Sequence, residues 1–181
     1  ISSTVGRPIG QLQVQRDAFA APKQLVVDVA FQYGDQETTL GNPRRGFWNP
    51  DDRELVLRNV QAERDLLQRL NEFPLQLATH HQYTPGQMTI HTKWLGPMVT
   101  SLSSEGWTII AHGKRMRPAS TFEIQVTSGE DWFDLDARVE FDGMVTTLPS
   151  LLAAMAKQRS YVVLDDGSHG VLPEEWLQKY E

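Results

Sequence analysis

The chain has 181 residues, of which 40% are hydrophobic and 22% charged, as in ordinary globular proteins. The net charge of -6 argues against a uniformly basic nucleic-acid-binding surface, and the absence of cysteine excludes disulfides, cysteine-bound zinc and thiol nucleophiles. No membrane-spanning run or signal peptide is evident. We therefore expect a soluble, cytoplasmic protein of one domain (1–181), or of one domain in two lobes (1–105 and 106–181). The initial Ile1 indicates a piece of a longer polypeptide.

The segment before residue 59 predicts a hairpin, a loop and a further strand. Apolar side chains recur with period two over 25–33, and Gly34-Asp35 then turns the chain, which is typical of a β-hairpin. Residues 41–53 are rich in proline, glycine and asparagine, and we predict a loop there. Residues 54–59 are compatible with a third strand or with the start of a helix, and we favour a strand that ends at Arg58.

Two helices are predicted next. Asn59 is a helix cap by type and position, and the helix that follows is expected to run to residue 71. A second helix is predicted over 85–104, because Thr84 and Gln87 form a capping-box pattern. Gly96-Pro97 is expected to kink or break it, since proline removes a backbone donor. The side chains expected to point inward from the first helix are Val60, Leu66, Leu67 and Leu70.

The second half of the chain reads mainly as strands. Residues 107–112 and 121–128 predict two strands that flank a basic loop. The stretch 133–141 alternates almost without fault between apolar and charged side chains, which indicates a strand with one face buried. Asp142-Gly143 is a strong signal for a tight hairpin turn.

A short pattern of strand, Asp-Gly turn, short strand, Leu-Pro and helix occurs twice, so a helix is also expected after Pro173. Asp142-Gly143 precedes Leu148-Pro149 at the same spacing at which Asp166-Gly167 precedes Leu172-Pro173. A strand over 144–146 and a helix over 148–158 complete the first unit, with Pro149 in the first turn of the helix. The repeat gives Asp166 a role in a turn. Together these elements predict an α+β fold of antiparallel hairpins with several packed helices.

Four catalytic or metal-binding interpretations can be weighed from the sequence. Asp134 and Asp136 share a strand face, as a carboxylate pair would, but charged residues continue that face in the manner of a solvated strand. The stretch around Asp166 does not have the spacing of a calcium loop, and Ser168 and His169 are neighbours that point to opposite faces of a strand. A zinc site could draw on three of the histidines, but no two of these have the spacing of a helix-borne zinc pair: His80, His81 and His91. We therefore predict no catalytic residue, metal or cofactor, and keep a metal-dependent or carboxylate hydrolase only as an alternative.

The basic residues give the stronger binding hypothesis. The candidates for contact with a phosphate backbone are Arg44, Arg45, Lys114, Arg115 and Arg117. The competing interpretation of Lys114, Arg115 and Arg117 is a solvated hairpin, which the negative net charge favours. No phosphate-binding loop is present, because Thr108 stands where that motif requires glycine and Arg115 where it requires serine or threonine.

The last third of the chain carries the motifs "DWFDLDARVEFDG", "LPSLLAAM" and "YVVLDDGSHGVLPEEWL". It resembles the bacterial helicase-associated domain that lies directly ahead of the ATPase core of SWI/SNF-type helicases. The residues that carry the resemblance are Trp132, Phe133, Leu135, Asp142, Gly143, Leu151, Leu152, Tyr161, Leu164, Asp166, Gly167, Ser168, Leu172, Pro173 and Trp176. Further upstream, Arg58, Asn59 and Glu63 resemble an Arg-Asp-x-x-x-Glu helix start, with Asn59 in place of the usual aspartate.

The resemblance implies an accessory role in a DNA-stimulated ATPase of helicase superfamily two. The module would dock on or regulate the ATPase core of the same polypeptide and would contact DNA or a partner protein. It implies a cytoplasmic, nucleoid-associated location and no enzymatic activity of the fragment itself, while the parent chain would hydrolyse ATP. A free-standing nucleic-acid-binding or protein-binding module is the alternative. The oligomeric state is not determined by the sequence. The aromatic residues expected in the core are Trp132, Tyr161 and Trp176.

Overall fold

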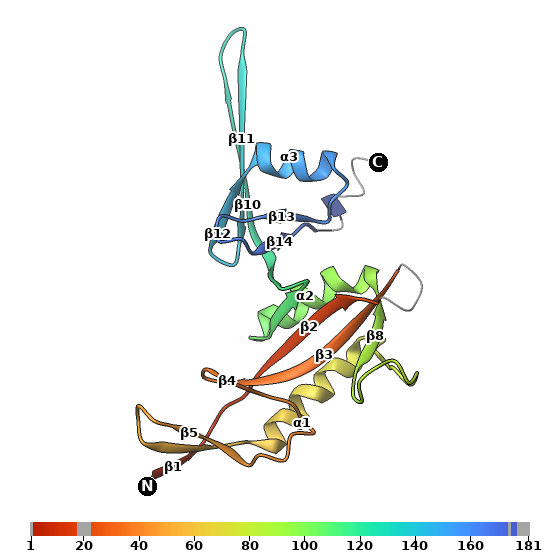
Figure 1. The fold of residues 1–181 in the computed structure, drawn as a ribbon. Helices are drawn as coiled ribbons and strands as arrows, with labels where there is room; N and C mark the ends of the chain where they lie inside the picture. The colour runs from red at the N-terminus through yellow and green to blue at the C-terminus, as the bar shows by residue number, and fades with distance from the viewer. Residues whose placement is uncertain (1, 18–22, 174, 177–181) are drawn as a thin grey trace.

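The protein is elongated and consists of two lobes joined along one long strand (Figure 1). The computed structural model describes residues 2–17, 23–173 and 175–176, except for the side chains at positions 124, 133, 135 and 136. Helices and a large mixed sheet make up both lobes, which confirms the predicted α+β class. None of the helices in the described residues is long and apolar enough to cross a membrane.

The N-terminal lobe is built on one twisted sheet in the order β9-β2-β3-β8-β7, with β4 on the free end of β3. β2 and β9 run parallel and the other neighbours are antiparallel. The strands of this sheet are β2 (Ile9–Arg16), β3 (Gln24–Tyr33), β4 (Gln36–Thr38), β7 (Gln76–Leu77), β8 (Met88–His91) and β9 (Thr108–Ala111). The predicted hairpin at Gly34-Asp35 is confirmed, and Gly34 has the positive φ of 62° that suits glycine.

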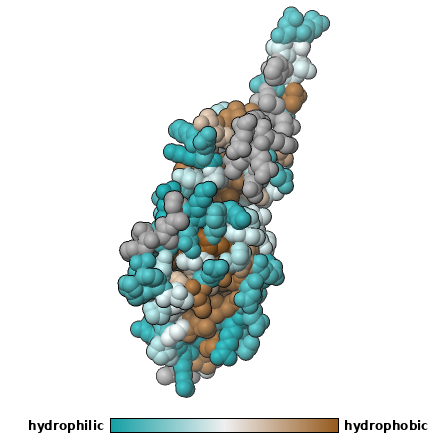
Figure 2. Space-filling view, turned by 90° about the vertical axis from the view of Figure 1, so that its right-hand side faces the viewer, coloured by the Kyte–Doolittle hydropathy of each residue, from teal (hydrophilic) through white to brown (hydrophobic). Residues whose placement is uncertain are grey.

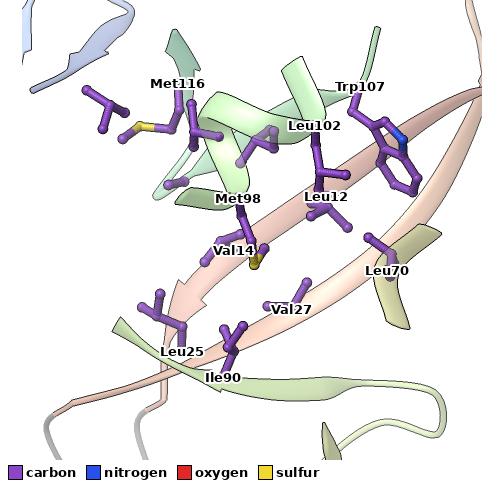
Figure 3. Packing of buried hydrophobic residues seen from close by; sticks show 14 residues of the cluster. Leu12, Val14, Leu25, Val27, Leu70, Ile90, Met98, Leu102, Trp107 and Met116 are labelled. Atoms are coloured by element: carbon purple, nitrogen blue, oxygen red, sulfur yellow. The ribbon is translucent and has the colours of Figure 1, made fainter. Parts of the chain in front are cut away.

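Helix α2 (Leu95–Ser104) covers one face of this sheet and forms the main core. Figure 3 shows Met98 and Leu102 of this helix directed at Leu12 and Val14 of β2. All four side chains are at most 1% exposed. This packing fixes α2 to the sheet because the apolar side of a helix must be removed from water.

The helix predicted over 85–104 begins ten residues later than expected, so that prediction is wrong in its first half. Residues 84–87 form a turn in which Thr84 N–H donates to the Gln87 side chain, β8 then completes the sheet, and a 3₁₀ turn, η2 (Thr92–Trp94), leads into α2. Pro97 falls in the first turn of α2, where its missing N–H leaves no hydrogen bond unmade. Gly96-Pro97 therefore starts the helix and does not kink it.

Helix α1 (Val60–Arg69) begins as predicted at the cap Asn59, whose side chain accepts from Ala62 N–H. It continues into η1 (Leu70–Glu72). Leu70 is buried, but Val60 is 41% exposed, which corrects its predicted inward position. Position 60 is the first residue of the helix and lies on the side away from the sheet. Glu63 is the residue of α1 that is fully buried.

A second, small sheet in the order β1-β6-β5 lies at the end of the N-terminal lobe. Its strands are β1 (Ser2–Val5), β5 (Gly46–Asn49) and β6 (Glu54–Leu57). β6 confirms the predicted strand. β5 lies inside the segment predicted as a loop, and that prediction is wrong because β6 supplies a pairing partner that local composition does not reveal.

The C-terminal lobe is formed by β10 (Lys114–Ser128), β11 (Phe133–Phe141), β12 (Met144–Thr147), α3 (Leu148–Ala156), β13 (Tyr161–Val163) and β14 (His169–Val171). Its core joins Val139 and Phe141 of β11 to Leu151 of α3 and Leu164 after β13. The alternation read in β11 is confirmed at Val139 and Phe141, which are both 0% exposed. β9 pairs with β2, so the chain passes between lobes along β10 and not at residue 105.

The prediction of a basic loop after β9 is also corrected. A two-residue turn at His112 (φ 51°) and Gly113 (φ 74°) joins β9 directly to β10, and Lys114 already pairs with Ala111. The basic side chains that follow therefore stand on a strand. The Asp142-Gly143 turn is confirmed, with φ of 49° and 84° and Phe141 paired with Met144.

The second Asp-Gly turn is longer than the first. β13 and β14 pair at Val163 and His169, so five residues connect them, and within this loop Gly167 alone has a positive φ. Both units are antiparallel hairpins, as the repeated pattern predicts. The helix expected after Pro173 falls largely on residues outside the described part of the chain.

Candidate functional site

A cleft of about 1000 Å³ lies between the two lobes. Its floor in the N-terminal lobe is the first half of α2, and β13 and β14 of the C-terminal lobe face it (Figure 1). The apolar residues in its lining are Leu25, Leu95, Pro97, Ala111, Met116, Ala119, Val171, Leu172 and Pro173. We call this feature the inter-lobe cleft.

An aromatic pair lies in the wall formed by the C-terminal lobe. The rings of Tyr161 and His169 are stacked, with centroids 4.2 Å apart and planes within 11°. The pair stands on the β13–β14 hairpin, whose backbone packs tightly: a side chain at Gly170 would lie 2.7 Å from the Phe141 ring. The Arg159 guanidinium is 6.0 Å from the centre of the Tyr161 ring, within cation–π range.

The charged groups at the cleft are mainly positive. Arg16 and Lys93 line it from the N-terminal lobe, both with exposed side chains, and Glu175 is the acidic side chain in the described lining. The pKa of His169 is lowered chiefly by burial, and also by the positive charges of Lys114, His112 and Arg159. The imidazole of His169 is therefore held neutral to a lower pH than usual.

Of the predicted basic residues, Lys114 is the one that contributes to this potential. Its side chain is exposed, and it acts on His169 from the start of β10. Arg115 is half exposed and lies 3.6 Å from the Asp142 carboxylate, a loose surface ion pair. Lys114 therefore acts on His169 without lining the cleft, and Arg115 is turned toward the Asp-Gly hairpin.

Arg117 has a structural position that the sequence did not reveal. Its guanidinium contacts Asp142 at 3.0 Å and Asp166 at 3.1 Å, and its Nε donates to the Ser168 hydroxyl at 3.0 Å. It therefore joins both Asp-Gly turns, and we call this set of contacts the Arg117 clamp. With its side chain 15% exposed, Arg117 offers little of its charge to a phosphate.

Asp166 completes the clamp from the second turn. Its carboxylate accepts from both the backbone N–H and the hydroxyl of Ser168. The Ser168 hydroxyl, then its backbone N–H, and Arg117 hold the pKa of Asp166 below its usual value. Asp166 and Ser168 therefore stabilise a turn, as the Asp-Gly pattern predicts. The Ser168 hydroxyl donates to Asp166, whose lowered pKa makes this carboxylate a weak base, so the pairing does not activate Ser168 as a nucleophile.

Arg44 and Arg45 lie far from the cleft, in the loop before β5. Both side chains are exposed, while their backbone carbonyls accept from Arg58, the Arg44 carbonyl from the guanidinium and the Arg45 carbonyl from the backbone N–H. Arg58 is buried and paired with Glu63 at 2.7 Å. The structure therefore separates the predicted basic residues into two groups, one in the loop before β5 and one at the start of β10.

The Arg58–Glu63 pair also includes Tyr33, and we call these three residues the buried network. The Tyr33 hydroxyl donates to Glu63 at 2.7 Å and accepts from the Asn59 N–H. Burial, together with this bond to Glu63, raises the pKa of Tyr33 to about 12. The network closes the loop that carries Arg44 over the start of α1, which gives the Arg58-Asn59-Glu63 motif a structural function.

The catalytic and metal alternatives find no assembled site in the described residues. Asp134 is exposed on β11, and the side chain of Asp136 lies outside the described part. The His80 and His81 rings are 4.4 Å apart, whereas the His91 ring nitrogen accepts from Lys93 N–H. Within 2–17, 23–173 and 175–176, no three histidine, aspartate or glutamate side chains are placed to hold a metal ion.

Sequence reasoning missed most residues of the cleft. Arg16, Lys93 and Arg159 are single cations in unrelated segments, and no local pattern links them. The Tyr161–His169 pair had a usable signal, because the two residues flank one predicted hairpin turn. No protein-family model matches the chain, no curated protein is significantly similar to it, and no solved structure gives a significant match.

Proposed function

We propose that the chain is a non-catalytic accessory module of a bacterial SWI/SNF-type ATP-dependent DNA helicase or translocase, and that it contacts nucleic acid through the inter-lobe cleft. The observation that carries the nucleic-acid contact is the stacked Tyr161–His169 pair in the wall of the cleft, which Arg16 and Lys93 also line. Lys114 and Arg159 lie outside the lining and add positive charge near His169 and Tyr161.

This combination suits a single strand of nucleic acid. Cations along a groove attract the phosphate backbone, and aromatic faces stack on exposed bases without regard to sequence. The apolar floor of the cleft gives the bases a surface from which water is excluded. Of the predicted contact residues, Lys114 is kept as a phosphate contact. Arg117 belongs to the Arg117 clamp, and Arg44 and Arg45 lie in the loop before β5.

The helicase context is supported by the resemblance in the last third of the chain. The residues of that motif fold together in the C-terminal lobe: Val139 to Phe141 and Leu151 meet Leu164 and Leu172 in one core. The two Asp-Gly turns of the motif are joined by Arg117. Because the residues of the motif stabilise one another, the motif defines a folding unit. Such a unit is consistent with a docking module whose catalytic residues lie in another domain.

The nucleic-acid contact is tested by fluorescence anisotropy with a labelled 20-nucleotide single strand. We expect Lys93→Glu with Lys114→Glu to weaken binding about tenfold or more at low salt, and to reduce the salt slope by about 1.4, because two phosphate contacts with a single strand are lost. The matched control is Arg44→Glu with Arg45→Glu, which changes the net charge equally at the remote loop and should leave affinity within about twofold.

Equal losses in the two double variants would reject the cleft as the site, since only net charge would then matter. A larger loss in the Arg44 and Arg45 variant would move the contact to the other lobe. The helicase context is tested separately by ATPase assays on the parent polypeptide with and without this segment. DNA-stimulated ATP hydrolysis that changes on deletion supports the accessory role, and a parent chain without such activity would contradict it.

A further inference from the structure

The distal part of the β10–β11 hairpin projects from the C-terminal lobe as a two-stranded ribbon (Figure 1). β10 pairs with β14 only over 116–118, and β11 pairs with β12 only over 138–141. Between them, residues 120–137 have no third strand in the described part of the chain. We call residues 120–137 the arm.

The arm is anchored at its base and open beyond it. Phe122 contacts the Trp176 ring at 4.9 Å, and Ala137 is buried at 2% exposure. Farther out, Val126 is 64% and Trp132 is 59% exposed, although Trp132 was expected in the core. Isolated two-stranded ribbons are marginally stable in water, and exposed apolar side chains on unpaired strands are typical of interaction surfaces.

The tip of the arm holds Trp132 in a fixed place. Gly129 N–H donates to the Trp132 carbonyl at 2.8 Å, which closes the turn at Glu130-Asp131. A side-chain carbon at Gly129 would lie 2.3 Å from Nε1 of Trp132, so the indole crosses directly over the glycine. An exposed tryptophan held in place by a glycine and a turn is prepared for a contact, since little conformational freedom is lost on binding.

The charge of the arm is opposite to that of the cleft. It contains five of the 23 carboxylates of the chain and none of its 17 lysines and arginines: Glu123, Glu130, Asp131, Asp134 and Asp136. The rest of the chain, with 18 carboxylates and 17 cations, has a formal net charge of -1. Figure 2 shows hydrophilic residues around the tip of this projection. Nearly all the excess negative charge is therefore concentrated on the arm.

We propose that the arm docks on a basic polypeptide surface, with a lysine or arginine side chain of the partner placed against Trp132 between the carboxylates of Glu130, Asp131 and Asp134. A tryptophan face attracts a cation, and the surrounding carboxylates complement its charge. The concentrated negative charge disfavours nucleic acid and a second copy of the arm, because both are negatively charged. This inference is independent of the nucleic-acid contact at the cleft.

The test is fluorine NMR of the whole chain labelled with 5-fluorotryptophan, in which the five tryptophans give separate signals. The probes are a ten-lysine peptide and a ten-arginine peptide, with a ten-glutamate peptide and a 20-nucleotide single strand as comparisons. We expect the basic peptides to shift the Trp132 signal in a saturable way, and the two acidic probes to leave it unchanged.

Affinity for the basic peptides is then compared among variants by calorimetry. Trp132→Ala should weaken binding about tenfold, and Glu130→Gln with Asp131→Asn about three- to tenfold. Trp48→Ala is the matched control for an exposed indole, since Trp48 is 50% exposed on the other lobe. Asp51→Asn with Asp52→Asn is the matched control for charge, because it removes two carboxylates near Trp48; both controls should stay within about twofold.

Three results would overturn the proposal. One is a Trp132 signal that the basic peptides do not move. Another is equal weakening by the neutralised pairs at positions 130 and 131 and at positions 51 and 52, since attraction to net charge alone would then explain binding. The last is a Trp132 signal that responds to the nucleic-acid strand and not to the peptides. Unchanged thermal unfolding of Trp132→Ala will show that the variant folds.

Discussion

Two arginines tie loops together in this molecule, one in each lobe, and they do so at very different depths. The Arg58 side chain is 2% exposed and its partner Glu63 is 0% exposed. The Arg117 side chain is 15% exposed, and its partners Asp142 and Asp166 are 53% and 38% exposed. Both guanidinium groups bridge segments that lie apart in the sequence, but only the Arg58 group is shielded from solvent.

The difference shows that burial determines how much stability is lost when an ion pair is broken. All five N–H groups of Arg58 are used, on Glu63 and on the carbonyls of Thr39, Asn42 and Arg44. A buried charge that loses its partner cannot regain water, so each member of the buried network depends on the others. The Arg117 clamp can exchange its partners for solvent at a smaller cost.

Glu63→Ala should have the largest effect, because it leaves the Arg58 charge buried and unpaired. We expect a loss of about 3–5 kcal/mol in the free energy of unfolding, measured by urea denaturation. The control is Glu72→Ala, which removes the 69% exposed partner of Arg69. If the two variants lose the same stability, the buried network is not what distinguishes this lobe.

Tyr33→Phe removes one bond of the network and leaves the ion pair in place. The expected loss is about 1.5–3 kcal/mol at pH 7, because the hydroxyl bonds to a charged group. In the native protein this contribution is complete below the unfolded tyrosine pKa of about 10 and is lost as pH rises through the folded value of about 12, since only the folded state retains the proton there. The free energy of unfolding, measured between pH 9 and 12, should show this decline in the native chain but not in Tyr33→Phe.

Arg117→Ala should cost less, about 1 kcal/mol, and only in the C-terminal lobe. Hydrogen exchange should quicken at Gly170 and Val171 of β14, which lies beside Arg117 in the sheet, while β2 and β3 keep their protection. Arg117→Lys should restore only part of the protection, because an ammonium group cannot contact both aspartates and Ser168 in the geometry of a guanidinium. Faster exchange in both lobes would contradict a local clamp.

His169→Phe should have the smallest effect on stability. The effect should appear mainly as a change in how stability depends on pH. The lowered folded pKa of His169 means that the unfolded state binds more protons, so stability falls as pH decreases below the unfolded value of about 6.5 and levels off below the folded value. Phenylalanine keeps an aromatic ring against Tyr161 but does not titrate. Thermal unfolding between pH 7.5 and 5 should therefore depend less on pH in the variant.

Local sequence signals predicted the elements that local interactions decide. The Asn59 cap, the Asp142-Gly143 turn and the alternation of β11 depend on residues close in the chain, and the structure confirms them. The misplaced start of α2 and the missed strand β5 have one cause in common. In each case another strand, the distant β3 for β8 and the neighbouring β6 for β5, provided a hydrogen-bonding partner that outweighed the local preference.

The candidate site was predictable only in part, because its members come from both lobes. Lys114 was identified as a cation, but Arg16 and Lys93 were not, since their proximity depends on how α2 and β14 face each other across the cleft. Arg117 was grouped with Lys114 because both are basic. Its pairing with Asp142 and Asp166 follows from the sheet register between β10 and β14.

The sequence by itself determined the class of fold, the turns and the separation of charge along the chain. These features depend on side-chain type and spacing, which are local properties. Only the tertiary structure decided which charges are buried, which are paired and which remain free for a partner. Those outcomes depend on distances between segments, and because the free energy of a charge varies with its access to water, Arg58 and Arg117 acquired different roles.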